Sequence, residues 1–150
     1  MAPPLPGEAP PQVHALFYRS LATRPMSNLD LHRLAVRAAE SNARLGVTGL
    51  LLYTRVIEGE GGLFAQWIEG PEARVRALYY DRIAHDPRHT DCEVVFDGPA
   101  REATGHDERQ FSRWGMSGIV ERPGLFPVSL ESFLERVPMY LYDPATRSYV

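Results

Sequence analysis

Four side chains with distinct chemistry stand out in this chain: Tyr18, Gln66, Trp114 and Met116. Each lies in a short apolar stretch that predicts a β-strand, and each can point to the same face of one sheet. A phenol, a carboxamide, an indole and a thioether gathered on a core face suit a flat aromatic ligand with polar edges better than plain packing. These residues are therefore candidates for a ligand-binding site.

Gln66 is the most informative of the four, because it lies between Phe64 and Ile68 on the inward face of its predicted strand. A carboxamide carries two N–H donors and an acceptor oxygen, and leaving it buried and unpaired costs about 1–3 kcal/mol. Tyr18 or the backbone could pair with it, and the polar edge of a ligand could complete the set. Periodicity alone leaves these alternatives open.

Trp114 and Met116 are two residues apart on one predicted strand, so they share a face of the sheet. Taken alone, such a pair is typical of ordinary core packing. A methionine thioether is polarizable and also packs well beside an aromatic ring. The pair therefore gains meaning only from the polar residues beside it.

The order of predicted elements is βαββαββ. Apolar runs predict strands at 14–22, 47–54, 63–69, 91–97 and 114–120. Two helices lie between them, one capped by Ser27 and stopped at Gly46, the other running from Pro71 to Pro87. A polar loop is expected at 101–109 and a short helix at 129–137. We expect an α+β, ferredoxin-like fold: a mixed five-stranded sheet, two helices on one face and a short C-terminal helical cap.

Polar residues continue the buried rows of both predicted helices. Asn42 follows the apolar row of the first helix, and Arg82 and Asp86 follow that of the second. If the strands that precede the two helices are central and parallel, the helices run in the same direction and their C-terminal turns meet. The pattern then predicts an apolar slot with polar groups at one end.

The other face of the sheet is also expected to be apolar. Trp67, Phe17, Leu51 and Val95 can all point that way. Such a face is too apolar to stay in contact with water. The helix at 129–137 or a second subunit should cover it.

Size and composition predict one domain and exclude several function classes. The chain has 150 residues, 44% of them hydrophobic, and a net charge of −3 without a basic stripe, so nucleic acid is not expected as a partner. No apolar run reaches membrane-spanning length, and the N-terminus lacks the pattern of a secretory signal. The single Cys92 fits a reducing, cytoplasmic location. We expect a disordered proline-rich arm at 1–12, a ligand-binding domain at 13–121 and a cap segment at 122–150.

Catalytic and metal motifs are not recognised in the sequence. The five histidines show no shared ligand spacing, so no metal site is expected. No nucleophile motif appears, and Cys92 has no evident base partner, which predicts a protein that is not an enzyme.

Five stretches, in their order and spacing, resemble the BLUF family, the sensors of blue light using FAD. They are LFYRSLA (16–22), SNARLGVTGLLLY (41–53), FAQWIEGP (64–71), DRIAHDPRH (81–89) and RQFSRWGMSG (109–118). The resemblance covers about residues 14–120. It is to short members that consist of the photoreceptor domain and a small C-terminal cap.

The resemblance implies FAD bound non-covalently between the two helices. Tyr18 would match the family's tyrosine that donates an electron and a proton to the excited flavin. Gln66 would match the glutamine that bridges this phenol to flavin N5 and O4, and whose hydrogen bonds rearrange by rotation or tautomerisation. Asn42 would bind the pyrimidine edge. Arg82, Asp86 and His89 would contact the polar edge of the flavin or the rest of the cofactor. Met116 would also contact the cofactor, and together with Trp114 it would carry the signal outward.

The resemblance also implies a signal passed to a separate, unidentified partner protein or through a change in a homo-oligomer. From charge and hydropathy, neither nucleic acid nor a membrane is expected to take part. Two departures from the family pattern bear on this. The hairpin across 53–66 is longer than usual, and Ala38 stands where many members carry a small hydroxyl residue. Two other classes fit the predicted fold: an acylphosphatase-like hydrolase, which needs an anion-binding loop, and an interaction module that binds no flavin.

Overall fold

The computed structural model describes residues 12–55, 62–118 and 129–137 and confirms the predicted α+β class. One five-stranded sheet has the order β4-β1-β3-β2-β5. Its strands are β1 (His14–Ala22), β2 (Thr48–Arg55), β3 (Gly62–Gly70), β4 (His89–Pro99) and β5 (Trp114–Gly118). The sheet is mixed, because β2 and β5 pair in parallel and the other neighbours are antiparallel.

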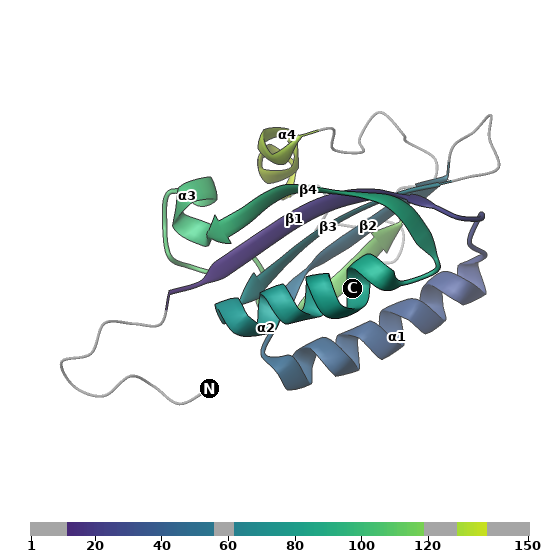
Figure 1. Ribbon diagram of the computed structural model, residues 1–150, viewed down its shortest axis with the longest axis horizontal. Helices are drawn as coiled ribbons and strands as arrows, with labels where there is room; N and C mark the ends of the chain where they lie inside the picture. Colours follow the sequence, from purple (N-terminus) through teal and green to yellow (C-terminus); the bar gives the residue numbers. More distant parts are fainter. Residues whose placement is uncertain (1–11, 56–61, 119–128, 138–150) are drawn as a thin grey trace.

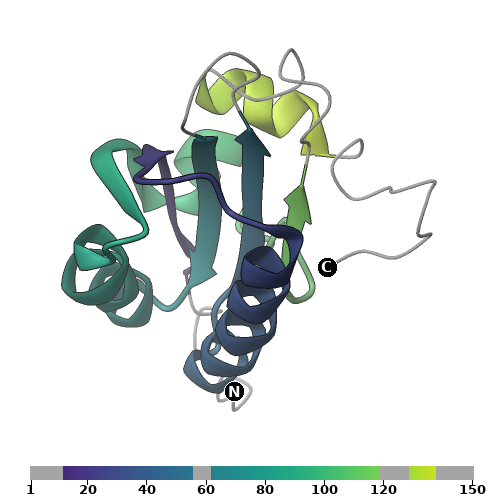
Figure 2. The same ribbon diagram turned by 90° about the vertical axis from the view of Figure 1, so that its right-hand side faces the viewer.

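Helices cover both faces of this sheet (Figures 1 and 2). On one face lie α1 (Asn28–Leu45) and α2 (Glu72–Ala77), and α2 continues into a π-helical turn, η1 (Leu78–Arg82), and a 3₁₀ turn, η2 (Ile83–His85). The short helices are α3 (Ala100–Thr104) and α4 (Leu130–Glu135). In Figure 1, α4 lies on the opposite side of the sheet from α1 and α2.

The ends of α1 follow directly from its sequence. The Ser27 hydroxyl accepts a hydrogen bond from the Asp30 backbone N–H, and the Asp30 carboxylate accepts one from the Ser27 N–H, which completes a capping box. Gly46 ends the helix in the left-handed conformation, with φ of 71°. Both signals were predicted from the sequence.

The predicted relative direction of the two helices is wrong. The preceding strands, β1 and β3, are central neighbours, but they are antiparallel rather than parallel. Each helix runs antiparallel to the strand that precedes it. Because these two strands are themselves antiparallel, α1 and α2 run in opposite directions, as their colour gradients show in Figure 1. Their C-terminal turns therefore do not meet.

Two helical details also differ from expectation. The helix predicted from Pro71 to Pro87 changes hydrogen-bonding pattern at Leu78, and the Ile83 N–H reaches back to the Leu78 carbonyl in the π-helical manner. The loop predicted at 101–109 begins instead with α3, which ends at Gly105 in the left-handed conformation. One helical turn of five residues is too short to produce a clear periodic pattern.

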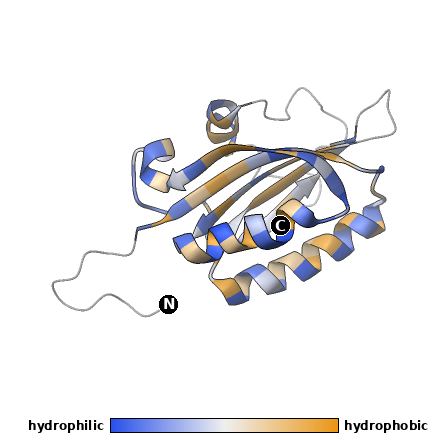
Figure 3. Cartoon of the chain, in the orientation of Figure 1, coloured by the Kyte–Doolittle hydropathy of each residue, from blue (hydrophilic) through white to orange (hydrophobic). Residues whose placement is uncertain are grey.

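Two hydrophobic cores lie on the two faces of the sheet. The core beneath α1 and α2 contains Leu16, Tyr18, Ile68 and Val75, and the opposite core contains Phe17 and other residues. Figure 3 shows hydrophobic and hydrophilic residues alternating along α1, as expected for a helix with one buried face.

Leu51 was assigned to the wrong face. It lies in the core beneath α1 and α2, because β2 places it opposite Gln66 of β3, whereas Leu50 and Leu52 point to the opposite core. Three consecutive leucines carry no alternation from which the face could be read.

The opposite core is covered by α4, which confirms one of the two expected covers. Phe133 is fully buried, with its ring centroid 4.7 Å from that of Phe17 and 6.0 Å from that of Trp67. Trp67 faces this side as predicted, and Val95 packs against it. Residues 1–11 of the predicted arm at 1–12, residues 56–61 of the hairpin tip, and residues 122–128 and 138–150 of the predicted cap segment lie outside the described residues, as do residues 119–121.

A fully buried carboxylate, Glu69, fixes the segment that leads into β5. It accepts hydrogen bonds from the Thr48 hydroxyl (3.0 Å), the Trp67 indole (2.9 Å) and the backbone N–H groups of Gln110 and Phe111 (both 2.8 Å). Each carboxylate oxygen receives two donors. These bonds attach residues 110–111 to β3, three residues before the start of β5.

We predict that Glu69→Gln lowers the free energy of unfolding by about 2–3 kcal/mol, because the new amide N–H₂ must face two donors. Chemical denaturation followed by circular dichroism measures this change. The control is Glu40→Gln, the same substitution at an exposed position of α1, which should change stability by less than about 0.5 kcal/mol. Equal stability of the two variants would contradict the anchoring role.

Candidate functional site

A cavity of about 300 Å³ lies between the sheet and the helices α1 and α2. Side chains from all five strands, from α1, from the turns η1 and η2 that follow α2, and from the segment after η2 line it. They include every predicted site residue except Met116: Tyr18, Asn42, Gln66, Arg82, Asp86, His89 and Trp114. Although the helices run in opposite directions, the cavity extends along both and so reaches Asn42 as well as Arg82.

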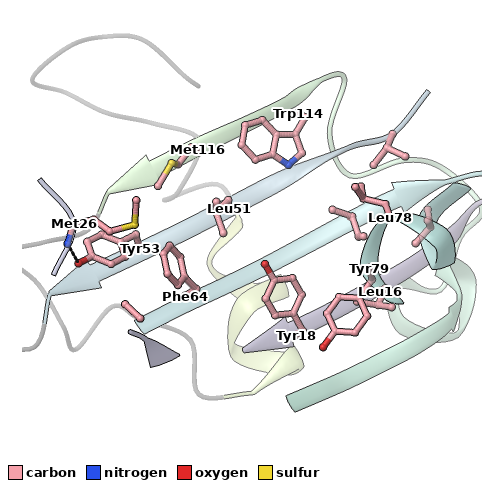
Figure 4. Close-up of a cluster of buried hydrophobic side chains, with 14 residues drawn as sticks. Leu16, Tyr18, Met26, Leu51, Tyr53, Phe64, Leu78, Tyr79, Trp114 and Met116 are labelled. Atoms are coloured by element: carbon pink, nitrogen blue, oxygen red, sulfur yellow. Dashed lines mark hydrogen bonds between the residues drawn. The ribbon is translucent and has the colours of Figure 1, made fainter. Parts of the chain in front are cut away.

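The Gln66 carboxamide links β1 to β5. Its Nε2 donates to the Tyr18 hydroxyl at 2.6 Å, and its Oε1 accepts from the Trp114 indole at 2.9 Å. Figure 4 shows the Tyr18 hydroxyl and the Trp114 nitrogen both directed toward the middle of this sheet face. An indole N–H can only donate, so Trp114 requires the amide oxygen on its side and thereby fixes the amide's orientation.

Strand register explains why these three residues meet. Tyr18 is the direct partner of Gln66 in the β1–β3 pair, and Leu51 is its partner in the β2–β3 pair. On the next strand, Met116 is opposite Leu51, and Trp114 lies two residues before it on the same face. The pairing of Tyr18 with Gln66 was one of the alternatives left open by the sequence.

Three polar side chains of the cavity have unused hydrogen-bonding capacity toward the described residues. The Tyr18 hydroxyl proton and the second N–H of Gln66 find no acceptor there. Asn42 is only 4% exposed, and its side chain makes no hydrogen bond with a described residue. Buried polar groups normally have partners, so the cavity favours a ligand with acceptor atoms at one edge and both donors and acceptors at another.

Burial also sets the protonation of the phenol. It raises the pKa of Tyr18 far above its usual value, while the hydrogen bond from Gln66 acts in the opposite direction. Tyr18 is therefore a neutral phenol that retains its proton at physiological pH. It can release that proton only to an acceptor within the cavity.

The charged residues at the cavity rim are not equivalent. Arg82 is exposed and makes no hydrogen bond or ion pair with a described residue. The Asp86 carboxylate instead accepts hydrogen bonds from the Arg88 guanidinium and backbone. Partial burial acts to raise the pKa of Asp86, but these Arg88 bonds outweigh it and the pKa lies below its usual value.

Both ring nitrogens of His89 already bond to the protein. Nε2 lies 2.6 Å from the Ile83 carbonyl oxygen and Nδ1 lies 2.7 Å from the Ser20 hydroxyl. Because a carbonyl can only accept, Nε2 carries a proton. The ring meets those of Tyr18 and Phe64 edge-on, so it packs beside the site rather than directing a free nitrogen into it.

Met116 is buried but does not line the cavity. It belongs to the same hydrophobic core as Met26 and Tyr53 and lies farther along β5 than Trp114 (Figure 4). Its role as a cofactor contact therefore stays a prediction.

Sequence reasoning missed several residues of the cavity wall, among them Arg37, Ser41 and Arg88. Arg37 and Ser41 follow Leu34 at i+3 and i+7, so the helical period could have identified them. Ala38 also lines the cavity, which places the missing hydroxyl of the family pattern at this site.

Among the described residues, no group of three His, Cys, Asp or Glu side chains could hold a metal ion. None of the helices described is both long and apolar enough to span a membrane.

The fold and the cavity define a class: an α+β sandwich with a cavity between its sheet and its helical layer. A sequence model of the BLUF family, described as sensors of blue light using FAD, matches residues 13–117. The chain therefore belongs to the BLUF family of flavin-based blue-light sensors.

Similar proteins agree with this assignment. The beta subunit of photoactivated adenylate cyclase from Euglena longa is 46% identical over 87 residues, which is 58% of this chain and 9% of that protein. The chain thus spans about a tenth of the curated relatives it matches.

Two solved structures are similar as well. BlrP1 of Klebsiella pneumoniae with FMN and cyclic diGMP has a TM-score of 0.60 and 29% identity, covering 85% of this chain and 30% of that one. The dark-state structure of BlrB, a BLUF protein, has a TM-score of 0.58 and 27% identity, covering 91% of both chains.

The raised pKa of Tyr18 predicts a loss of stability in alkali. Above pH of about 10 the unfolded chain releases this proton while the folded chain keeps it, so folding weakens by up to about 1.4 kcal/mol per pH unit. Tyr79, whose pKa burial raises to about 12, adds to the same loss. Tyr18→Phe should therefore show a shallower fall in unfolding free energy between pH 10 and 11.5, measured by urea denaturation at each pH. Identical slopes would mean that the Tyr18 phenol is not shielded in the fold.

Proposed function

We propose that this chain is a blue-light photoreceptor module that binds FAD non-covalently in the cavity. The observation that carries the proposal is the set of buried donor groups of Tyr18 and Gln66 that find no acceptor among the described residues, next to the Asn42 amide, which makes no hydrogen bond with these residues either. A flavin offers acceptor atoms at N5 and O4 and a donor–acceptor pattern on its pyrimidine edge. This pattern fits the unused groups of the cavity.

The residues have distinct roles in holding the cofactor. Gln66 and Tyr18 would face the N5/O4 edge, and Asn42 would bind the pyrimidine edge. Arg82 would contact a polar atom at the rim, while Asp86 would act mainly by orienting Arg88, to which it is bonded. His89 would pack beside the ring system.

When bound, the flavin absorbs blue light and becomes a strong electron acceptor. Tyr18 would lose an electron and its hydroxyl proton together, because a buried phenol does not ionise beforehand. The hydrogen bond between Tyr18 and Gln66 would then change, and Gln66 would reorganise its amide by rotation or tautomerisation. A carboxamide can present either a donor or an acceptor at one position, which permits two networks in one pocket.

Trp114 couples this switch to the edge of the sheet. If the Gln66 amide rotates, its N–H₂ faces the Trp114 N–H, and two donors then oppose each other. The indole would have to shift or find another acceptor. Trp114 begins β5, an edge strand that also carries Met116, so this shift would reach the surface through that strand.

We propose that the module signals as a sensor rather than as an enzyme, to a separate partner protein or through a homo-oligomer. The family assignment and the names of relatives that join such domains to cyclases support this role. The free thiol of Cys92 is consistent with a cytoplasmic location. The donors of Tyr18 and Gln66 that lack an acceptor among the described residues favour a flavin-binding module over both an acylphosphatase-like hydrolase and a module that binds no flavin.

We predict that the purified protein takes up FAD, turns yellow and shows a reversible red shift of its visible band under blue light. Gln66→Leu should keep the flavin but lose the red shift, since no amide remains to bond to O4. Absorption spectra before and after illumination measure both.

The matched control is Gln110→Leu, because the Gln110 side chain bonds only to His106 among the described residues and lies outside the cavity. It should photocycle like the wild type. A normal red shift in Gln66→Leu would rule out the proposed switch, and colourless protein after FAD addition would rule out the proposed function.

A further inference from the structure

A second hollow, of about 210 Å³, adjoins the flavin cavity. It lies between the segment before α1, the first half of α1 and the segment after η2. Leu34, Arg37 and Arg88 line both spaces, so the two are neighbours with a common wall.

The second hollow is strongly basic. Arg24, Arg33, Arg37 and Arg88 line it, and we call these four residues the arginine basin. The one acidic residue in its wall, Asp30, accepts a hydrogen bond from the Ser27 backbone N–H in the capping box of α1 rather than from an arginine. This concentration of positive charge occurs in a chain whose net charge is −3.

Three of the four guanidinium groups have unused donors. Arg24, Arg33 and Arg37 make no hydrogen bond or ion pair with any described residue, whereas Arg88 bonds to Asp86. Arg33 and Arg37 are also four residues apart on one helix, where like charges destabilise the helix. An anion in the basin would offset this repulsion.

We propose that the arginine basin receives the diphosphate of the bound dinucleotide. Guanidinium groups match phosphate oxygens in geometry and charge. The basin lies beside the cavity that we assign to the ring system, where the chain of a flavin nucleotide would continue. This inference rests on the proposed function. It implies that the protein distinguishes FAD from other flavins by binding its phosphates as well as its ring system.

The test compares riboflavin, FMN and FAD on flavin-free protein by quenching of flavin fluorescence. In wild type, affinity should rise from riboflavin to FMN to FAD, and the advantage of FAD should shrink in high salt. The variant Arg24→Gln/Arg33→Gln changes residues that line only the basin. It should bind FAD about tenfold more weakly and riboflavin within about twofold of wild type.

The matched control is Arg44→Gln/Arg74→Gln, which removes two exposed arginines that line neither space. It should bind all three flavins like the wild type. The basin variant loaded with riboflavin should still show the full red shift, because the groups around Gln66 are unchanged.

The possible failures are distinguishable. If wild type binds riboflavin as tightly as FAD, or if the basin variant weakens all three flavins equally, the basin assignment is wrong while the red shift preserves the proposed function. If FMN binds as tightly as FAD, the assignment of the second phosphate is wrong. If no flavin binds at all, both proposals fall.

Discussion

The hydrogen bond from the Trp114 indole to the Gln66 oxygen is the interaction on which the site depends. A carboxamide between two hydroxyl partners could lie in either orientation, because a hydroxyl both donates and accepts. An indole only donates, so it selects one orientation and leaves N–H groups toward Tyr18 and the cavity. The polarity of the cavity wall is thus decided by a residue on the far edge of the sheet. Any change in the position of Trp114 changes what the cavity offers to a ligand.

The position of Trp114 depends in turn on the opposite side of β3. Gln66 faces the cavity, and a few residues farther along the same strand the buried Glu69 carboxylate binds the backbone just before β5. Trp67 donates to Glu69 and lies against Phe133 of α4. The strand β3 therefore carries the Gln66 amide on one face. On the other face it carries Glu69, which positions the segment before Trp114, and Trp67, which contacts the covering helix α4. Residues of β3 thus contact both the cavity side of the sheet and the core beneath α4.

Local patterns were enough to predict the elements and the central residues of the site. Apolar runs located the strands to within about two residues, and the capping residues located α1. The predictions that were wrong concerned features that depend on contacts between residues far apart in the sequence. The direction of α2 relative to α1 follows from the antiparallel pairing of β1 and β3, which no local pattern contains. Glu69 was missed because two of its donors are backbone N–H groups, which every residue except proline possesses. The face of Leu51 required knowledge of its partner, Gln66.

The two ends of the ligand space impose different physical requirements. Around Gln66 the groups are neutral and buried, and hydrogen-bond direction decides which arrangement is stable, since charge there would carry a large desolvation cost. In the arginine basin the groups are charged and closer to water, where attraction acts over distance but is screened by salt. The orientation of the Gln66 amide and the positive charge of the arginine basin are set by different residues on different elements. A substitution in the basin can therefore alter affinity without altering the amide network, and the sequence around Gln66 can remain fixed while cofactor selectivity varies.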